Sequence, residues 1–536
     1  MAQQEISCGL DFMTAPDLQE CLTEALHANF AFIVSPIVHP RFRRPIFPSG
    51  GTVGGFTRSD MILSPQDWNS RIVGKISEYL DPDSPSPVVR QRHEDCLNEE
   101  LTHHLTIIWV SVPMVCPQTL KTNSNAENET EAWNEPWLWW TKFHERMGWD
   151  KRIGVVIELS ADLPSQEVLK RWLGEPIKAV IVPTSLFISN KKGLKKDWSL
   201  IQCIVRNLVL YEWEDYLQTP LQPLADNLDT HTYNVFEKDP VKYDQYQKAI
   251  SQALNNENDK PITVMVLGAG RGPLVRATLN AADITNSKVK VIEKNPCAVV
   301  VLAAQVREVW RDRDVTVIPG DMRQVNLSPK ADIIVSELLG SWGDNELSPE
   351  CLDGAAGLLK SCGISIPREY NSYVAPISSP RLWAAARSAS PGNYAQIEKN
   401  LETLWCVFTF NHPAKANKNY EGQDLTDFRG LPLTDNRRST TLTWDVEQDN
   451  VMHGFGGYFD CSLYGKEMIS IVPSTHSPGM ISWFPIFIPI KKGDKIKATF
   501  WRCVSPRRVW YEWIVEVGEH TTPLHNPNGR SSEMLL

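Results

Sequence analysis

The length, composition and charge of the chain narrow the class of protein. At 536 residues it is too long for one hydrophobic core, so two to four domains are expected, and its 42% hydrophobic and 22% charged residues are typical of globular proteins. A formal net charge of -10 argues against direct, non-specific nucleic-acid binding and is compatible with basic partners. The 11 cysteines include no C-x-x-C pair, which favours a reducing compartment over disulfides or zinc, so no metal is expected.

The apolar runs and the N-terminal residues predict where the protein is located. The N-terminal sequence MAQQEISCGLDF lacks the basic and apolar regions of a signal peptide, and the longest apolar runs fall short of a membrane span. We therefore expect no membrane association and a location in the cytoplasm and the nucleus.

Residues 1–215 are predicted to form an α/β domain with a largely parallel sheet. Apolar runs at 30–38, 105–115, 153–159 and 178–187 alternate with helical stretches such as 165–174, and the acidic stretch 123–136 is predicted to be a loop. A TIM barrel takes about 250 residues and eight strands. Four or five convincing strands therefore indicate a TIM-barrel-like domain that is shortened or incomplete.

Residues 216–377 are predicted to form a second α/β domain, of the doubly wound, Rossmann type. Helices interrupted at Pro240 lead into strand segments at 262–274, 288–295, 314–323 and 331–340, with helices between them. The ligand site of such a sheet lies at the carboxyl ends of its strands. Residues 378–536 then carry short, aromatic-rich runs separated by turn residues, which predict an antiparallel β-barrel or sandwich.

Residues at three predicted strand ends favour an adenosyl ligand. Gly268 and Gly270 open a G-x-G-x-G turn that lets a ligand approach the backbone at a helix N-terminus. Glu293 can accept hydrogen bonds from both hydroxyls of a ribose, and Asp321 with Met322 can meet an adenine ring. Each residue alone has an ordinary structural explanation, but the three in order favour the ligand.

Two adenosyl ligands fit this pattern. A dinucleotide fingerprint requires a third glycine where this chain has Pro273, whereas S-adenosylmethionine has no pyrophosphate and does not need it. The sulfonium of S-adenosylmethionine is stabilised by aromatic faces, which Tyr233, Phe236 and Tyr243 can supply, unless they only pack their segment on the sheet. An NAD(P) dehydrogenase remains an alternative at this stage.

Glu337 and Glu346 flank the loop that follows the last of these strands. Gly340 and Gly343 allow the loop to double back, so that the two carboxylates face one another. A metal site would recruit further His or Asp ligands, and sugar hydrolysis would leave the nucleotide-type site unused. A guanidinium fits best, because it is planar, permanently charged and suited to bidentate pairing. Trp342, within the loop, is expected to pack rather than to contact substrate.

The predicted chemistry is an in-line methyl transfer to a guanidinium nitrogen. Because the pKa of a guanidinium is around 13, catalysis must come mainly from alignment and electrostatic preorganisation. One of the two glutamates can take the proton late in the reaction.

Several motifs resemble the type II protein arginine methyltransferase family. They are VLGAGRGPLV, EKNP, GDMR, ADIIVSELLGSWGDNELSPECLDG, THSPGMISWFPI and FWRC followed by VWYEW. The resemblance runs from about Tyr211 to the C-terminus and extends into the N-terminal part through patches such as HPRFRRP. It implies a TIM barrel, a Rossmann-type methyl-donor domain and a C-terminal β-barrel that completes the substrate groove.

The resemblance also implies roles for individual residues. Glu337 and Glu346 would clamp the substrate arginine, and Phe236 would shape the pocket for symmetric dimethylation. The methyl donor would contact Tyr233, Lys242, Tyr243, Gly268, Gly270, Glu293, Asp321 and Met322, and the substrate groove would be lined by Leu221, Ser482, Trp483 and Phe484. The donor would be S-adenosyl-L-methionine, with S-adenosyl-L-homocysteine as product and no metal.

The family resemblance sets expectations for substrates and partners. It implies arginine-containing proteins as substrates, including Gly/Arg-rich tails, histones and spliceosomal Sm-type proteins, and it implies a homo-oligomer. Family members run longer after EELTHHL and around IQCIVRNLVLYEWEDY, so the barrel that docks a WD-repeat β-propeller partner is shortened here. A donor-binding, non-catalytic scaffold with impaired assembly is therefore the alternative to an enzyme.

Overall fold

The computed structural model describes much of the chain, which divides into two compact units, Met1–Glu212 and Trp213–Leu536. The described residues are 9–11, 18–36, 44–45, 52–53, 72–76, 108–115, 126–146, 149–150, 153–159, 171–172, 174–181, 216–256, 262–282, 287–389, 399–408, 417–421, 435–444, 451–493, 496–517 and 520–536. Each unit is described by itself.

Unit 1 is built on a parallel sheet whose described strands follow one another in chain order. The order is β1 (Gly9–Asp11), β2 (Phe32–Pro36), β5 (Ile72–Ile76), β6 (Ile108–Pro113), β7 (Ile153–Glu158) and β8 (Ile177–Ile181). Neighbouring strands are parallel throughout, as in a TIM barrel. The four predicted apolar runs supply β2, β6, β7 and β8. Strand β1 escaped prediction because it has only three residues, and β5 because its sequence IVGKI, interrupted by Gly74 and Lys75, is not a continuous apolar run.

Helix α5 (Ala126–Arg146) overturns one prediction. The acidic stretch 123–136 was predicted to be a loop, yet it is helical from Ala126 onward. Its Ala and Glu residues favour helix, and negative charge is stabilised at a helix N-terminus. The predicted helix 165–174 lies mostly outside the described residues. Helix α1 (Leu18–His27) and the paired strands β3 (Arg44–Pro45) and β4 (Thr52–Val53) complete the described elements of unit 1.

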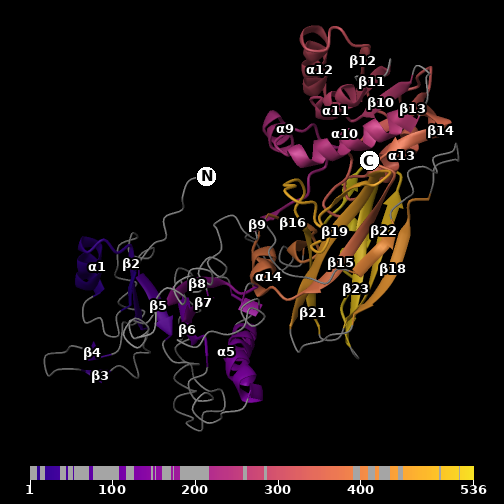
Figure 1. Ribbon diagram of the computed structural model, residues 1–536. Helices are drawn as coiled ribbons and strands as arrows, with labels where there is room; N and C mark the ends of the chain where they lie inside the picture. Colours follow the sequence, from indigo (N-terminus) through magenta and orange to yellow (C-terminus); the bar gives the residue numbers. More distant parts are fainter. Residues whose placement is uncertain are drawn as a thin grey trace. The chain divides into compact units, whose positions relative to one another are not determined.

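Unit 2 contains a parallel sheet of the predicted Rossmann type (Figure 1). Its order is β12 (Val315–Pro319), β11 (Lys288–Glu293), β10 (Thr263–Leu267), β13 (Ala331–Ser336) and β14 (Leu359–Ile366). The connecting helices are α11 (Pro273–Ala281), α12 (Pro296–Glu308) and α13 (Ser348–Ala355), the last followed by the 3-10 turn η4 (Ala356–Leu358). The chain order reverses between β10 and β13, which is where doubly wound sheets bind ligands.

Two helices precede this sheet, and they meet where the sequence predicts an interruption. Helix α9 (Thr230–Phe236) is capped by Asp229, and helix α10 (Pro240–Asn256) begins at Pro240. Proline is favoured at the first position of a helix, where no N–H partner is needed. Tyr246 and Ile250 lie on the buried face of α10, and the Tyr246 hydroxyl donates to Ser336 O at 3.0 Å. Helix α10 is thereby fixed against the end of β13.

Two antiparallel sheets form the rest of unit 2. One has the order β17 (Asn417–Glu421), β15 (Glu369–Ile377), β19 (Met452–Tyr464), β21 (Ile486–Gly493), β16 (Trp405–Phe408) and β9 (Tyr216–Gln218), with β20 (Glu467–Ser470) paired to β19. The other has the order β18 (Arg438–Trp444), β22 (Ile496–Ser505), β23 (Arg508–Val517) and β24 (His520–Thr521), with β25 (Met534–Leu535) paired to β23. Phe455, Ile488, Phe500 and Trp513 belong to one buried cluster between the two sheets. The short helices α14 (Pro380–Arg387) and η5 (Pro527–Gly529) flank them.

The pairing moves one domain boundary away from its predicted place. The sequence analysis began the antiparallel domain at residue 378, but β15 already pairs with β19 along its whole length. Strand β9, predicted to start the Rossmann domain, pairs with β16. The hydrogen-bond partners of a strand decide which sheet it joins. The pattern of apolar and polar residues does not reveal those partners.

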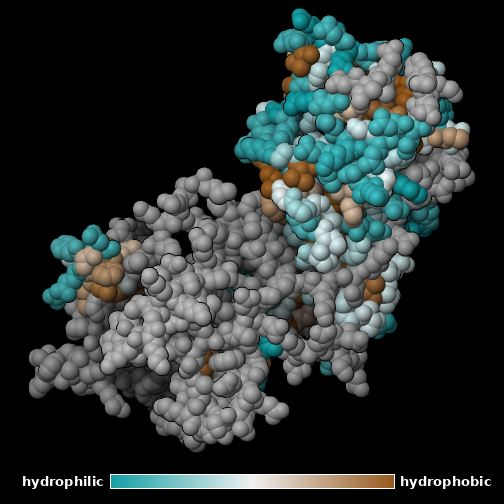
Figure 2. All heavy atoms as spheres, viewed as in Figure 1, coloured by the Kyte–Doolittle hydropathy of each residue, from teal (hydrophilic) through white to brown (hydrophobic). Residues whose placement is uncertain are grey.

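The face of unit 2 that Figure 2 shows is mostly hydrophilic where its residues are described. Figure 2 shows small apolar spots, one of them over α12, where Val300 and Val309 are each 69% exposed. None of the helices in the described part of the chain is long and apolar enough to span a membrane. Among the same residues, no group of three or more His, Cys, Asp or Glu side chains could hold a metal ion.

Candidate active site

The glycine turn joins β10 to α11 at the carboxyl edge of the Rossmann sheet. Gly270 and Gly272 have φ angles of 55° and 99°, where a residue with a Cβ pays about 1–2 kcal/mol. A Cβ on Gly270 would lie 2.9 Å from Cε1 of Tyr233. The turn therefore lies directly against the ring of Tyr233.

Glu293 ends β11 with its carboxylate directed at this turn. Its Oε2 accepts a hydrogen bond from Gly270 N at 2.7 Å, and its Oε1 accepts one from Asn295 N at 2.7 Å. Burial raises the pKa of Glu293, although these backbone hydrogen bonds oppose the rise. A buried acceptor at this place suits the hydroxyls of a ribose, and its role remains a prediction.

Asp321 and Met322 follow β12 at the same edge of the sheet. Asp321 is paired with Arg323, with 2.7 Å between Oδ2 and Nη2. Burial acts to raise the pKa of Asp321, but the hydrogen bonds from Arg323 outweigh it and lower the pKa. A Cβ on Gly268 would lie 3.4 Å from Cε of Met322. Met322 thus reaches the glycine turn, and Arg323 is a partner of Asp321 that was not predicted from the sequence.

Arg271 fastens helix α9 to the glycine turn. Its Nε and Nη2 donate to the two carboxylate oxygens of Glu237 at 2.8 and 2.7 Å, and Nη2 also donates to Asn234 Oδ1 at 2.7 Å. The guanidinium carbon lies 5.8 Å from the ring centroid of Tyr233. Since α9 carries Tyr233 and Phe236, this bidentate pair fixes both rings beside the turn.

The ammonium group of Lys242 lies among three aromatic rings. Its Nζ is 5.6 Å from the ring centroid of Phe236, 4.8 Å from that of Tyr243 and 4.9 Å from that of Trp483. Only 2% of the Lys242 side chain is exposed, and its Nζ is 3.5 Å from Oε2 of Glu337. Aromatic faces and a carboxylate both stabilise a cation. The switch point of the sheet is therefore a cation site.

Glu337 and Glu346 lie at the two ends of the loop between β13 and α13. The loop doubles back through hydrogen bonds in both directions between Gly340 and Gly343, at 2.9 and 3.0 Å. Burial and the nearby charge of Glu337 raise the pKa of Glu346 well above its usual value, although Lys242 opposes the rise. The fold therefore brings the two carboxylates close enough for one to influence the ionisation of the other.

Trp342 packs the loop down, as predicted. It is fully buried, and its Nε1 donates to Tyr373 O at 3.1 Å. Its ring centroid lies 5.9 Å from that of Phe500 and 5.0 Å from that of Tyr511. Trp342 thus belongs to the core between the antiparallel sheets.

The segment from Ile481 to Phe484 brings part of the predicted groove wall to the site. Trp483 has a φ of 62°, a conformation that costs a bulky residue roughly 1–3 kcal/mol. Its Nε1 donates to Leu339 O at 2.7 Å, inside the loop that carries the two glutamates. Phe484 follows directly and is half-buried.

Asp239 holds this segment in place, and the sequence analysis missed it. Its Oδ1 accepts hydrogen bonds from Val241 N at 3.0 Å and Lys242 N at 3.3 Å, in the first turn of α10. Its Oδ2 accepts hydrogen bonds from Ile481 N at 2.9 Å and Ser482 N at 2.7 Å. Burial acts to raise the pKa of Asp239, but these hydrogen bonds lower it. An aspartate directly before a proline is a helix-start signal that could have identified the cap, though not its contact with residues 481 and 482.

The contacts of the described residues join most of the predicted site residues into one group. These are Tyr233, Phe236, Lys242, Tyr243, Gly268, Gly270, Glu293, Met322, Glu337, Glu346, Ser482 and Trp483. Asp321 adjoins the group through Met322. Leu221 lies after β9 and is 41% exposed, and its place in the groove stays a prediction.

Comparison with known proteins identifies the class and then the family. Three sequence profiles match the chain: "PRMT5 TIM barrel domain" over residues 29–105 and 102–206, "PRMT5 arginine-N-methyltransferase" over 205–366, and "PRMT5 oligomerisation domain" over 369–534. The class is thus that of the protein arginine methyltransferases. Protein arginine N-methyltransferase 5 of Xenopus laevis is 39% identical over 98% of each chain, and that of Drosophila melanogaster is 37% identical over 89% of this chain and 91% of its own. The chain belongs to the protein arginine N-methyltransferase 5 family.

The same comparison bears on the length of the barrel. The match to the Xenopus laevis protein extends over 637 positions, more than the 536 residues of this chain. The two matches to the TIM-barrel profile meet at residues 102–105. That junction is where the sequence analysis places the first missing strand-helix unit, after EELTHHL.

Replacing Glu346 by Gln should stabilise the unliganded protein, and more so as the pH rises. A glutamate whose pKa is higher in the folded than in the unfolded state stabilises the fold at low pH and loses that contribution as the pH rises toward its folded-state pKa. Glutamine cannot ionise. By calorimetry we expect Glu346→Gln to raise the Tm by about 1–3 °C at pH 8.5 and by less at pH 5.5. Glu516→Gln, at a carboxylate that is 42% exposed, is the control. An equal gain at both pH values contradicts the prediction.

Asp239→Ala should destabilise unit 2 and weaken the groove. It removes the acceptor of four backbone N–H groups, with an expected loss of about 2–3 kcal/mol in the free energy of unfolding. Asp244→Ala, on the exposed side of the same helix, is the matched control. Denaturant unfolding gives the stability, and peptide titration gives the KM for an arginine substrate, which should rise. Equal stability of the two variants would exclude this role for Asp239.

Proposed function

We propose that the chain transfers methyl groups from S-adenosyl-L-methionine to arginine ω-nitrogens of proteins, giving monomethylarginine and symmetric dimethylarginine. The observation that carries the proposal is the cation site, where Lys242 lies among three rings with Glu337 beside it. A second carboxylate, Glu346, stands close by at the switch point of the Rossmann sheet. Membership of an arginine methyltransferase family supports the same reaction.

The residues at the strand ends suit an adenosyl donor. Glu293 offers a buried acceptor beside the glycine turn, and Met322 lies against Gly268. Position 273 is a proline, so the turn lacks the third glycine that a pyrophosphate requires. These features favour S-adenosyl-L-methionine over a nicotinamide dinucleotide. When bound, the donor supplies an activated methyl group on its sulfonium.

The two glutamates have distinct tasks in this proposal. Together they accept hydrogen bonds from the substrate guanidinium and fix its plane, so that one ω-nitrogen faces the methyl group. The new N–C bond forms as the S–C bond breaks, the electron pair stays on sulfur, and S-adenosyl-L-homocysteine leaves. The proton released from nitrogen passes to a carboxylate and then to solvent. Glu346 suits this step, because burial and the nearby charge of Glu337 raise its pKa and so favour its protonated form.

Phe236 supports the symmetric product by its place in the cation site. Its ring centroid lies 5.6 Å from Lys242 Nζ, and that ammonium is 3.5 Å from Glu337, so the ring lies close to one of the two proposed clamp residues. In this proposal the ring directs the second methyl group to the other ω-nitrogen. Product analysis by acid hydrolysis and mass spectrometry tests this point, and asymmetric dimethylarginine would contradict it.

The proposed partners follow from charge and family. Arginine-containing tails, such as those of Gly/Arg-rich, histone and Sm-type proteins, complement the net charge of -10. The match of residues 369–534 to a domain described by its oligomerisation supports a homo-oligomer. Docking of a WD-repeat β-propeller on the shortened barrel, and a location in the cytoplasm and nucleus, belong to the same proposal.

Glu337→Gln should abolish methyl transfer while leaving donor binding nearly unchanged. The substitution removes one charge that orients the guanidinium, and loss of such an interaction lowers kcat by about 100-fold or more. Transfer of labelled methyl groups to an Arg/Gly-rich peptide gives the rate, and calorimetry with S-adenosyl-L-methionine gives the Kd. The control is Glu308→Gln, on the exposed end of α12. A wild-type protein that binds the donor without transferring methyl groups would instead be a non-catalytic scaffold.

A further inference from the structure

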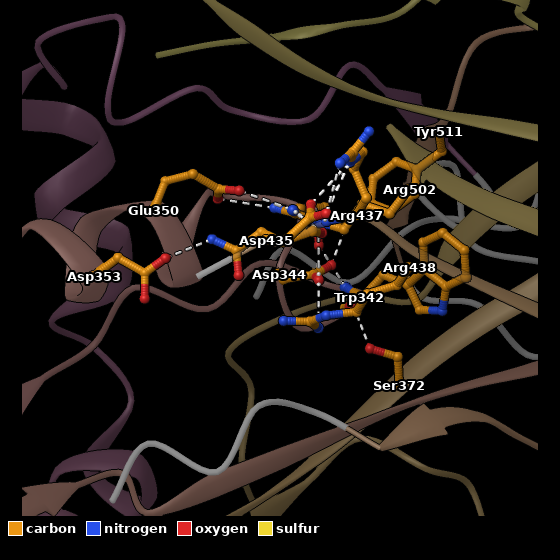
Figure 3. A network of polar contacts seen from close by, with 12 residues as sticks. Trp342, Asp344, Glu350, Asp353, Ser372, Asp435, Arg437, Arg438, Arg502 and Tyr511 are labelled. Carbon is orange, nitrogen blue, oxygen red and sulfur yellow. Dashed lines mark hydrogen bonds and ion pairs between the residues drawn. The ribbon is translucent and has the colours of Figure 1, made fainter. Parts of the chain in front are cut away.

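Asp344 lies between the two glutamates and was assigned no role above. It is two residues before Glu346, and none of its surface is exposed. Figure 3 shows it at the centre of a network of polar contacts that links the loop to the antiparallel sheets. An unneutralised carboxylate would be costly there, and cationic and hydroxyl groups surround it.

The partners of Asp344 come from three strands of one antiparallel sheet. Its Oδ2 is 3.0 Å from Arg502 Nε on β22 and accepts a hydrogen bond from Arg438 Nη1 on β18 at 3.2 Å. Its Oδ1 accepts a hydrogen bond from the Tyr511 hydroxyl on β23. The tip of the catalytic loop is therefore tied to β18, β22 and β23 at once.

Arg502 extends this connection to the far side of Glu346. Its Nη1 and Nη2 each donate to one carboxylate oxygen of Glu350 at 2.8 Å, in bidentate geometry. Glu350 lies in the first turn of α13. Only 1% of the Arg502 side chain is exposed, and its Nη1 also donates to Asn436 O at 3.0 Å. One guanidinium thus holds the residues two before and four after Glu346.

The remaining contacts make the loop rigid between its two glutamates. Trp342 N donates to Asn345 Oδ1 at 2.7 Å, and Trp342 O accepts from Ser372 Oγ at 2.9 Å. Leu347, directly after Glu346, has a φ of 67° in the left-handed region. A non-glycine residue keeps such a conformation only when its surroundings enforce it. The backbone around Glu346 is therefore held from both sides.

We propose that Asp344 and Arg502 are positioning residues for catalysis, which set the place of the Glu346 carboxylate relative to Glu337. The inference rests on the proposed function, in which both carboxylates fix one guanidinium plane. Bound groups that shift by about 1 Å can cost 100-fold in rate. The antiparallel domain would then act on the reaction through Arg502, besides lining the substrate groove.

Asp344→Asn in the full-length protein tests the inference. Asparagine keeps the size of the side chain and removes the charge that attracts Arg502. We expect kcat to fall by about 10- to 100-fold, with the Kd for S-adenosyl-L-methionine within twofold of wild type. Arg502→Lys should show a similar loss, because lysine keeps the charge but cannot form the bidentate pair. The double variant should be no slower than the slower single variant, since both changes break one connection.

The matched control is Asp435→Asn. Asp435 pairs with Arg437, and both are drawn in Figure 3, but their side chains are 60% and 68% exposed, in contrast to the buried Asp344 and Arg502. Its kcat should stay within twofold of wild type. Thermal unfolding confirms that each variant is folded at the assay temperature.

The outcomes separate this inference from the proposed function. A wild-type protein that transfers no methyl group overturns the proposed function. An active wild type with an equally active Asp344→Asn overturns only the positioning role. If kcat and donor binding fall in proportion, the network serves stability alone, and the positioning role is overturned. The same conclusion holds if neither Asp344→Asn nor Arg502→Lys folds.

Discussion

The site depends on holding two half-buried carboxylates close together. Like charges at close range raise each other's pKa and destabilise the fold unless a cation offsets them. In this chain Lys242 supplies the cation, and the rings of Phe236, Tyr243 and Trp483 surround it. Helix α10, the loop after β13 and the segment before β21 all contribute to this one place.

Sequence alone predicted the part of the site that lies at strand ends. Gly270 and Met322 follow parallel strands and Glu293 ends one, and parallel strands of a doubly wound sheet end at one edge. Their proximity therefore follows from the alternation of strands and helices. Glu337 could be placed at this edge for the same reason, because it directly follows β13. Glu346 could be placed near Glu337 because the glycines between the two residues allow the loop to double back.

Pairing between distant segments could not be predicted in the same way. Asp239 gives a local signal as a helix cap, but its contact with Ser482 joins segments 243 residues apart. In the sequence, nothing distinguishes Arg502 from the other charged residues of the β domain. Its importance follows from the contact with Asp344, which only the structure shows. The same applies to β15, which belongs to the antiparallel sheet because it pairs with β19, and its own residues do not predict this pairing. Strand β5 was missed because Gly74 and Lys75 interrupt its apolar run.

The two charge clusters of this domain differ in a way that matches their tasks. In the positioning network the carboxylates of Asp344 and Glu350 face the guanidinium groups of Arg438 and Arg502, so two negative charges meet two positive ones.

In the candidate active site Glu337 and Glu346 share one ammonium, that of Lys242. One positive charge is therefore lacking when both glutamates are ionised, in agreement with the raised pKa of Glu346. A permanently charged guanidinium would supply the missing positive charge and favour the ionised carboxylates that hold it in the proposed reaction. Substrate binding would in this way prepare the base for the step that follows.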